Sequence, residues 1–277
     1  MNKLLKAAAA TTIALSLFGC GASKEADDKT LTIGATSSPH GIILEEAAKL
    51  MEKEGYTLEI KEFSDYPNIN PSTSDGSLDA NYFQHQPYLT SYNADEGFKE
   101  GDEGYLVSAG AIHYEPLGAY SKDIEKITLD ALDEGAQIVV PNDATNEARG
   151  LLLLQDLGLI QLSEDATLDK ATVKDIVENP KKFEIVEVDA AQSASKLEDV
   201  AIAVVNGNYA LDANIEKYLR ANEDSNSEAA QTYQNVIAVR EENKEDEAVK
   251  KLVEILKSDE IKEFIEKEFG VAVVPAE

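Results

Sequence analysis

Strand-like and helix-like runs alternate along this sequence. Residues 31–35 form a short β-prone run, residues 41–54 have the apolar spacing of an amphipathic helix that Gly55 ends, and residues 56–60 alternate as in a strand. A β-α-β opening of this kind pairs parallel strands through a crossover, and ligands bind at the carboxyl ends of such strands. The alternation therefore predicts an α/β fold built in layers.

The same order continues through the rest of the chain. Residues 137–140 have the composition of a buried strand, residues 141–143 supply a turn and a helix cap, and residues 144–157 have a helical pattern that Gly158 ends. Further strands are predicted at residues 79–83, 184–188 and 200–205, and further helices at residues 70–78, 88–93, 210–219 and 246–269.

Two extended runs, at residues 113–120 and 235–240, separate the α/β units, and we place a chain crossing between two lobes at each of them. This predicts one lobe of mixed sheet and flanking helices from residues 30–115 and 240–277. The second lobe comprises residues 116–239 and includes the second crossing. Two lobes leave a cleft between them, which is a common place for a small-molecule site.

The N-terminus has the features of a bacterial export signal. Two lysines precede an apolar run at residues 7–18, and the single cysteine, Cys20, follows shortly after it. The run is shorter than the roughly 20 apolar residues that a membrane-spanning helix needs. We therefore expect residues 1–19 to be a cleaved signal peptide and the mature chain to have no transmembrane segment.

Residues 17–20, LFGC, resemble a bacterial lipobox. The resemblance implies that Cys20 is acylated, becomes the new N-terminus and anchors the protein at the extracytoplasmic face of the cell membrane, with residues 20–29 as a polar tether. Two or more acyl chains suffice for a stable anchor. Phe18 is bulkier than the residue usual at that position, and the alternative is a soluble secreted protein with an incidental cysteine.

The chain is strongly acidic. It has 53 acidic and 25 basic residues, and removal of the two lysines of the signal leaves a net charge of about −30. Such a surface should repel nucleic acid and anionic lipid, and we interpret the charge as a solvated outer surface rather than a ligand site. With no cysteine left for a disulfide, a packed core from the 43% hydrophobic residues must supply stability.

One short segment holds an unusual share of the aromatic side chains. Aromatic residues make up only 6% of the chain, yet Tyr82, Phe83, His85 and Tyr88 fall within seven residues. A core strand would account for the tyrosines and Phe83, and this alternative stays open, but it explains His85 and the two interspersed glutamines less well. An aromatic wall with a few polar groups suits a ligand pocket, and sulfur–ring contacts of about 0.3–1.5 kcal/mol suit a thioether in particular.

Arg149 is the second candidate. It follows the predicted strand at residues 137–140 and the turn at residues 141–143, near the start of the predicted helix, where a cation opposes the helix dipole unless an anion is bound. Asn146 is three residues earlier and so shares a helix face with Arg149. Free backbone N–H groups and a guanidinium fork together make a carboxylate site. The alternative is a surface arginine paired with a neighbouring glutamate.

A third candidate is the polar turn at residues 206–209, NGNY, which follows a buried strand run. A sheet presents side chains to a crevice at such a point, although an ordinary turn would look similar. Tyr66 and Asn235 are single polar residues near predicted element ends, and they carry no weight by themselves.

Three motifs match one family in order. They are NYFQHQPYL at residues 81–89, HYEPLG at residues 113–118 and PNDATNEAR at residues 141–149. The chain resembles the methionine-binding lipoproteins of ABC importers, the NlpA family, over residues 31–275. The resemblance implies a two-lobed periplasmic-binding-protein fold of type II with two interlobe crossovers, no catalysis, no cofactor and no bound metal.

The resemblance also implies three kinds of group in the site: walls around the methionine side chain, a cation for the α-carboxylate, and amides for the amino-acid head group. In that order these are Tyr66, Phe83, His85 and Tyr88; Arg149; and Asn146, Asn206 and Asn235. Asn208 remains an alternative to Asn206, because the local run offers two asparagines.

The ligand and the class of protein have alternatives. L-methionine, D-methionine, a methionine-containing dipeptide or another apolar amino acid would suit the same pocket, and an ABC permease with its ATPase would be encoded by separate chains. A metal receptor has only His40, His85 and His113 to offer, at no tight ligand spacing. An extracellular hydrolase would need a motif such as Gly-x-Ser-x-Gly or His-Glu-x-x-His, which the sequence lacks.

Overall fold

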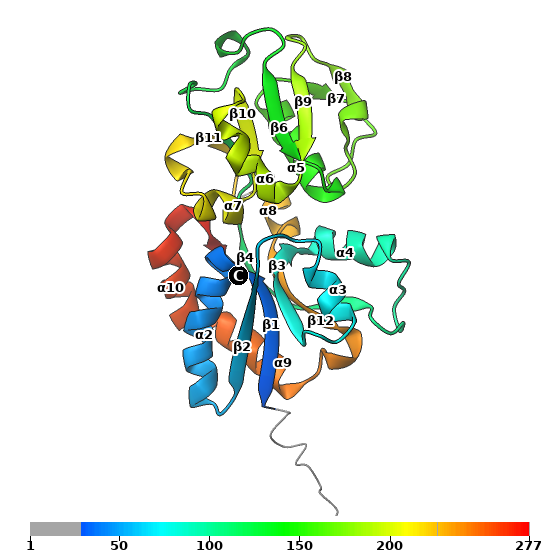
Figure 1. The fold of residues 1–277 in the computed structure, drawn as a ribbon, viewed down its shortest axis with the longest axis vertical. Coiled ribbons are helices and arrows are strands. Elements are labelled where there is room, and N and C mark those ends of the chain that lie inside the picture. Colours follow the sequence, from blue (N-terminus) through cyan, green and yellow to red (C-terminus); the bar gives the residue numbers. More distant parts are fainter. Residues whose placement is uncertain (1–28, 226, 277) are drawn as a thin grey trace, which may run out of the picture.

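Two lobes stacked along the long axis make up the computed structural model (Figure 1), which describes residues 29–225 and 227–276. The predicted signal peptide and Cys20 lie outside these residues. Within the described part of the chain, no helix combines the length and apolarity needed to cross a membrane. The α/β class and the two-lobed architecture that the sequence predicts are confirmed.

The first lobe is built on a six-stranded mixed sheet in the order β13-β4-β12-β3-β1-β2. β1 pairs in parallel with β2 and β3, whereas β12 runs antiparallel to β3 and β4. The strands are β1 (Thr30–Thr36), β2 (Thr57–Phe63), β3 (Ala80–His85), β4 (Leu106–Tyr114), β12 (Asn235–Arg240) and β13 (Val274–Pro275).

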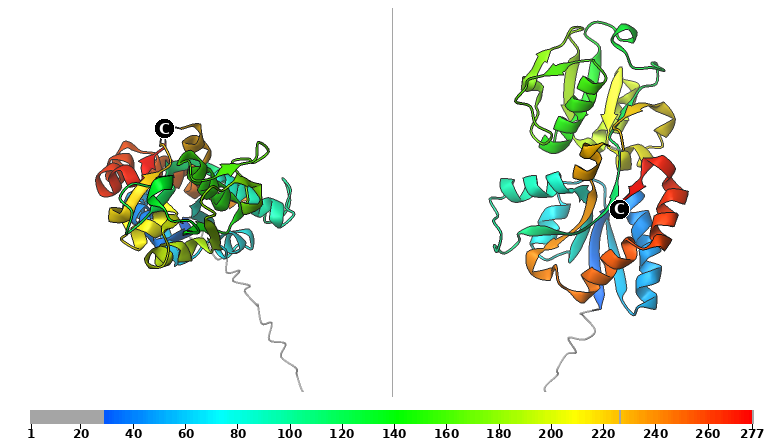
Figure 2. Two further views of the ribbon diagram at one scale, coloured as in Figure 1. Left: turned by 90° about the horizontal axis from the view of Figure 1, so that it is seen from above. Right: turned by 180° about the vertical axis from the view of Figure 1, so that it is seen from behind.

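Helices cover both faces of this sheet. α2, α9 and α10 pack together on one face, as Figures 1 and 2 show, and α3 and α4 lie on the other. Their bounds are α2 (Ile42–Lys53), α3 (Ile69–Ser74), α4 (Gln86–Asp95), α9 (Glu247–Leu256) and α10 (Asp259–Phe269). α2 buries Ile43, Leu44 and Met51 against the strands, which is the amphipathic pattern read from the sequence.

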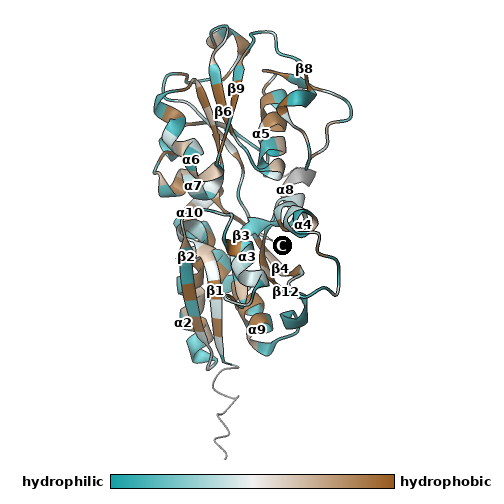
Figure 3. Ribbon diagram, turned by 45° about the vertical axis from the view of Figure 1, so that its right-hand side comes forward, coloured by the Kyte–Doolittle hydropathy of each residue, from teal (hydrophilic) through white to brown (hydrophobic). Residues whose placement is uncertain are grey.

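The second lobe is built on a five-stranded sheet in the order β11-β5-β10-β6-β9, and β7 pairs with β8 beside it. The strand β6 is mostly apolar in Figure 3 and buried along most of its length. This composition is expected of a strand in a sheet that is covered on both faces. The elements are β5 (Gly118–Tyr120), β6 (Gln137–Pro141), α5 (Ala144–Asp156), β7 (Gln161–Leu162), β8 (Ile176–Glu178), β9 (Glu184–Val188), α6 (Ala190–Ser193), β10 (Ile202–Val205), α7 (Gly207–Asp212) and β11 (Leu219–Asn222).

The chain passes between the lobes twice. The first passage joins β4 to β5 between Tyr114 and Gly118, and the second joins β11 to β12 and carries α8 (Glu228–Thr232). We expected the second crossing at residues 235–240, within the second lobe, and that is wrong. These residues form β12, which pairs between β3 and β4 in the first lobe and is buried there, so the crossing comes earlier in the chain.

Two predicted helices are also shorter than expected. The helix predicted at residues 210–219 ends at Asp212, because the backbone turns through a positive φ of 53° at Asn214 and then pairs as β11 from Leu219. The single helix predicted at residues 246–269 is two helices. The side chain of Ser258 caps the second by accepting a hydrogen bond from the backbone N–H of Ile261 at 3.4 Å.

Candidate ligand-binding site

A cavity lined by residues of both lobes lies between them. All eight residues proposed from the sequence border it, together with four others. A wider groove beside it, bordered by Lys122 and Tyr218, is more open to solvent, so the enclosed cavity is the better candidate for a small ligand. The lining residues are Tyr66, Phe83, Gln84, His85, Tyr88, Glu115, Asn146, Arg149, Asn206, Gly207, Asn208 and Asn235.

Sequence reasoning missed Gln84, Glu115 and Gly207 and left Asn208 as an alternative. Gln84 and Glu115 belong to the first two family motifs, so the motifs contained the signal that each lies near the site. Asn208 and Asn206 both border the cavity, which removes the need to choose between them.

Three rings from the first lobe form an aromatic wall. The ring centroids of Tyr66 and Phe83 are 5.5 Å apart, those of Tyr66 and Tyr88 are 5.8 Å apart, and those of Phe83 and Tyr88 are 5.7 Å apart. The hydroxyl of Tyr66 donates to Asn208 Oδ1 at 2.5 Å, which ties this wall to the second lobe. Tyr66 and Phe83 are buried and Tyr88 is half-buried, so the wall offers mostly ring carbon to a thioether or aliphatic side chain.

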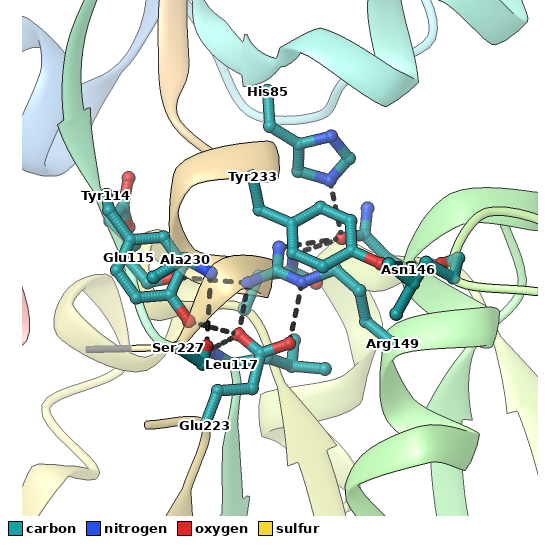
Figure 4. A network of polar contacts seen from close by, with 12 residues as sticks. His85, Tyr114, Glu115, Leu117, Asn146, Arg149, Glu223, Ser227, Ala230 and Tyr233 are labelled. Atoms are coloured by element: carbon teal, nitrogen blue, oxygen red, sulfur yellow. Dashed lines mark hydrogen bonds and ion pairs between the residues drawn. The ribbon is translucent and has the colours of Figure 1, made fainter. Parts of the chain in front are cut away.

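Arg149 lies at the base of the cavity, on α5, with only 3% of its surface exposed (Figure 4). Its Nε donates to Glu223 Oε1 at 3.0 Å and its Nη2 to Glu223 Oε2 at 2.6 Å, and its guanidinium stacks 4.4 Å above the Tyr233 ring. The arginine is therefore buried rather than on the surface, and its glutamate partner comes from the second interlobe passage rather than from a neighbouring position.

This pairing keeps Arg149 charged inside the protein. Burial by itself would lower the pKa of Arg149, but the Glu223 carboxylate outweighs burial and raises it above its ordinary value. Burial would likewise raise the pKa of Glu223, but Arg149 keeps it below the usual range. Nη1 is the guanidinium nitrogen that does not bond to Glu223, and among the described residues it donates only to Asn146 Oδ1, at a long 3.3 Å. It remains available for an anion.

Asn146 joins several of the cavity groups. Its Oδ1 accepts from Asn206 Nδ2 at 2.9 Å, and its Nδ2 donates to both carboxylate oxygens of Asp143 at 2.9 and 3.0 Å. Asp143 also caps α5, because its side chain accepts from the backbone N–H of Asn146 at 3.1 Å. The helix cap thus orients the amide, and the amide in turn orients Asn206 and Arg149.

His85 connects the lobes in its neutral form. Its Nδ1 accepts from the backbone N–H of Tyr88 at 3.1 Å, so the ring proton is on Nε2, which donates to Asn146 Oδ1 at 3.1 Å. Burial, reinforced by the nearby charge of Arg149, lowers the pKa of His85 to about 3. The imidazole is therefore a fixed hydrogen-bond donor at neutral pH.

Behind the cavity, Glu115 and Asn235 contact two more buried histidines. His113 Nε2 lies 2.8 Å from Glu115 Oε1, and His40 Nε2 lies 3.0 Å from Asn235 Oδ1 and 3.3 Å from Glu115 Oε1. His40 lies on the single turn η1 (Ser37–Gly41), directly after β1. The coordinating atoms of His40, His113 and Glu115 lie within 4.8 Å of one another, which is near enough to approach one metal ion.

The histidine hydrogen bonds argue for a polar network instead of a metal centre. His40 Nδ1 is 2.7 Å from Thr36 Oγ1, and His113 Nδ1 contacts the hydroxyl of Tyr82. With a hydroxyl donating to each Nδ1, both imidazoles carry their proton on Nε2 and donate it toward the cavity residues. Burial lowers the pKa of His40 to about 4 and that of His113 to about 3, so both rings are neutral at pH 7.

Three buried polar atoms of the cavity lining have no hydrogen-bond partner among the described residues. They are Glu115 Oε2, Asn206 Oδ1 and Asn208 Nδ2. Buried polar atoms are almost always paired, so a cluster of exceptions in one cavity indicates a polar ligand. Two of the three atoms are acceptors, and they lie in the same cavity as the free nitrogen of Arg149.

The comparisons with known proteins agree with this geometry. The sequence model of the NlpA lipoprotein family matches residues 31–277. The chain belongs to the NlpA lipoprotein family. Among its relatives, the methionine-binding lipoprotein MetQ of Bacillus subtilis is 37% identical over 282 residues, covering 99% of both chains. The D-methionine-binding lipoprotein MetQ of Escherichia coli K12 is 38% identical over 275 residues, covering 98% of this chain and 97% of the relative.

Solved structures of the family have the same fold. A nutrient-binding protein from Burkholderia cenocepacia bound to methionine is 43% identical, with a TM-score of 0.81, over 89% of this chain and all of that one. An ABC transporter periplasmic substrate-binding protein from Coxiella burnetii is 40% identical, with a TM-score of 0.79, over 89% of this chain and 100% of that one.

Proposed function

We propose that this chain is the substrate-binding lipoprotein of an ABC importer and that it captures methionine outside the cytoplasmic membrane. The observation that carries the proposal is the enclosed interlobe cavity, which combines an aromatic wall with a buried arginine and unpaired acceptor atoms. An amino acid with an apolar side chain and two head-group charges matches that combination. Relatives named for methionine support the choice of ligand.

In the proposed complex, the α-carboxylate lies against Arg149 Nη1, and Asn235 donates to it as well. His40 occupies Asn235 Oδ1, which leaves the Asn235 amide nitrogen as the group able to contact a ligand. The thioether lies among the rings of Tyr66, Phe83 and Tyr88. Because both lobes contribute walls, binding holds the lobes closed, and a separate permease with its ATPase recognises the closed form.

Calorimetric titration of ligand-stripped protein tests this proposal. We expect one methionine to bind per chain, with heat signals that saturate at a 1:1 ratio, and we expect alanine and glutamate to bind far more weakly because neither fills the aromatic wall. L-methionine, D-methionine, a methionine dipeptide and leucine should be compared in the same buffer, because one relative is named for methionine and another for D-methionine. Saturable binding of a metal ion with no response to any amino acid would contradict the proposal.

The proposal contains no catalytic step. Within the described residues, the polar side chains of the cavity are amides, two tyrosines, a paired arginine, a glutamate and one neutral histidine, and the relatives are named as binding proteins. The same titration samples should therefore contain unchanged methionine after prolonged incubation, and product release from an amino-acid ester or peptide would contradict this part.

The lipid anchor at Cys20 is a second element of the proposal and rests on the sequence and on relatives named lipoproteins. Cells expressing the chain and fed an alkyne analogue of palmitate should label the wild-type protein, and the Cys20→Ser variant should carry no label. Cys20 is the single cysteine, so no other thiol can substitute for it. A Ser16→Ala variant serves as a control for changes within the signal region, and equal labelling of Cys20→Ser and wild type would contradict the anchor.

A further inference from the structure

Glu115 is the one acidic side chain among the described residues that line the cavity. It lies on the first interlobe passage, directly after β4, and only 6% of its surface is exposed. One carboxylate oxygen, Oε1, is held by His113 at 2.8 Å, with His40 at 3.3 Å. The other, Oε2, makes no hydrogen bond of normal geometry among the described residues, although the backbone N–H of Asn208 lies near the carboxylate and favours its charged form. A buried carboxylate oxygen without a partner is costly unless a ligand supplies one.

The position of Glu115 relative to Arg149 matches the head group of an α-amino acid. Arg149 Nη2 donates to the backbone carbonyl oxygen of Glu115 at 3.1 Å, so the cation and the anion of the cavity belong to residues in direct contact. An α-amino acid carries its carboxylate and its ammonium on one carbon atom, and therefore needs its two receptors side by side. Asn206 Oδ1, the second unpaired acceptor, lies in the same lining.

Gly207 allows this arrangement. A Cβ atom at position 207 would lie 2.7 Å from Glu115 Oε2 and 3.0 Å from Glu115 Cβ, which is closer than real side chains approach. The start of α7 can therefore approach the Glu115 carboxylate only because residue 207 has no side chain. The absence of a side chain leaves Oε2 at the edge of the cavity.

We propose that Glu115 Oε2 accepts hydrogen bonds from the α-ammonium group of the ligand, and that this contact selects free amino acids over their α-hydroxy and N-acylated analogues. The inference rests on the proposed function and adds to it a residue that determines specificity. His113 positions the carboxylate by donating to Oε1, which leaves Oε2 for the ligand. An α-hydroxyl or an N-acyl amide brings no positive charge to Oε2, so each would leave the carboxylate poorly compensated.

The proposed contact makes the affinity for the ligand depend on pH. Burial raises the pKa of Glu115 to about 7, against the opposing effects of His40, Arg149 and a backbone hydrogen bond from Asn208, while Asp212 raises it slightly further. An ammonium group beside Oε2 favours the charged form and lowers this pKa, so binding near neutral pH releases a proton. Affinity then rises with pH up to about 7 and falls by about tenfold for each pH unit below it.

The other titratable groups that face Glu115 do not obscure this pH dependence. His40 and His113 are neutral at pH 6 to 8, because burial holds their pKa values at about 4 and about 3. The pKa values of the surrounding tyrosines are raised by burial, and Arg149 stays charged. The facing groups are His40 on η1, Tyr66, Tyr82 on β3, His113 on β4, Tyr120 on β5, Arg149 on α5 and Asp212 on α7.

Methionine titrations of the wild type and the Glu115→Gln variant test the inference. Glutamine has nearly the same shape and can still accept from His113, but it has no charge. At pH 8 we expect the variant to bind methionine at least tenfold more weakly than the wild type, and its affinity should not change between pH 6 and 8. Titrations at pH 7 in phosphate and in Tris buffers measure proton release, which should be close to half a proton for the wild type and zero for the variant.

A ligand series gives a second readout. The wild type should bind methionine at least a hundredfold more tightly than its α-hydroxy analogue or N-acetylmethionine, and Glu115→Gln should reduce the gap to the α-hydroxy analogue. Glu147→Gln is the matched control: Glu147 is a buried glutamate on α5 that accepts from the backbone N–H of Val173 and does not line the cavity. Its methionine affinity and pH profile should equal those of the wild type.

The possible outcomes are distinct. A Glu115→Gln variant that binds like the wild type, or that still releases a proton, overturns the inference. Proton uptake by the wild type, with tighter binding at low pH, also overturns it, because it would mean that a protonated Glu115 donates to the carboxylate. If the variant does not fold, the proton release and the ligand series of the wild type still decide the matter. Failure of the wild type to bind methionine at any pH would instead contradict the proposed function.

Discussion

Replacement of Arg149 by lysine should weaken methionine binding at least a hundredfold, equivalent to about 3 kcal/mol. The substitution keeps the positive charge but removes the planar fork, which contacts Glu223 through two nitrogens, the Glu115 carbonyl oxygen and Asn146. A single ammonium group that stays with Glu223 cannot also reach the ligand carboxylate. Calorimetric titration of both proteins with methionine measures the loss.

Lysine is preferable to alanine at this position because the buried Glu223 needs a cation. Removing one partner of a buried ion pair costs about 3–5 kcal/mol of folding stability, so an alanine variant would confuse unfolding with lost binding. Arg220→Lys is the matched control. Arg220 donates only to backbone carbonyl oxygens in the same lobe, those of Ile124, Lys217 and Leu219, and it does not line the cavity. Equal affinity of Arg149→Lys and Arg220→Lys would refute the carboxylate contact.

The ligand-free protein should lose roughly 3 kcal/mol of unfolding free energy between pH 6.5 and pH 5. Burial lowers the pKa of His40 to about 4 and, with Arg149 contributing at His85, lowers those of His85 and His113 to about 3. Their ordinary pKa is 6.5, so below that pH the unfolded chain binds three protons that the native protein excludes. The stability they contribute is complete above pH 6.5 and is lost as the pH falls toward 4.

Glu115 changes the unfolding free energy in the opposite direction as the pH falls. Burial raises its pKa to about 7, so between pH 7 and its ordinary pKa of 4.5 the native protein holds a proton that the unfolded chain releases. The proton that Glu115 releases on unfolding offsets the proton that one histidine takes up. Where all three histidines of the unfolded chain are charged, unfolding therefore takes up about two protons, and the unfolding free energy changes by about 2.7 kcal/mol per pH unit. The pKa values of Asp143 and Glu147 are also raised by burial and reduce the slope further at lower pH.

Denaturant unfolding at pH 7, 6 and 5 measures this slope. His85→Asn provides a comparison, because asparagine can still accept the Tyr88 N–H at the start of α4 but does not titrate. The unfolding free energy of the variant should depend less steeply on pH, by the amount that corresponds to about one proton. An unfolding free energy that is the same at pH 7 and pH 5 would show that the buried histidines are not held neutral.

Local patterns in the sequence were sufficient for most of the secondary structure. The runs at residues 31–35 and 137–140 lie in β1 and β6, and the helix that follows the cap at Asp143 is α5. Apolar periodicity, turn residues and cap residues depend on side chains a few positions apart, so they can be read directly from the chain. Helix ends were less certain, as at residues 210–219, where a strand of the second lobe begins instead.

The residues around the ligand site could be predicted because local chemistry and the family motifs agreed. Arg149 near a helix start and the aromatic run at residues 82–88 each indicated a binding group, and the family resemblance, carried over by position, added Tyr66 and Asn235, which have no local signal. Phe83, His85 and Tyr88 from this run border one cavity with Arg149, Tyr66 and Asn235, whereas Tyr82 packs in the core of the first lobe.

The tertiary structure alone decided how these residues act together. It placed residues 235–240 in the sheet of the first lobe, paired Arg149 with Glu223, which is 74 positions later, and left Glu115 Oε2 without a hydrogen bond of normal geometry to any described residue. An extended run has the same sequence pattern whichever sheet it joins. The residues next to a charged side chain in the sequence do not identify a distant partner. Strand pairing and buried charge pairs depend on which segments fold together, whereas periodicity and capping depend only on neighbours along the chain.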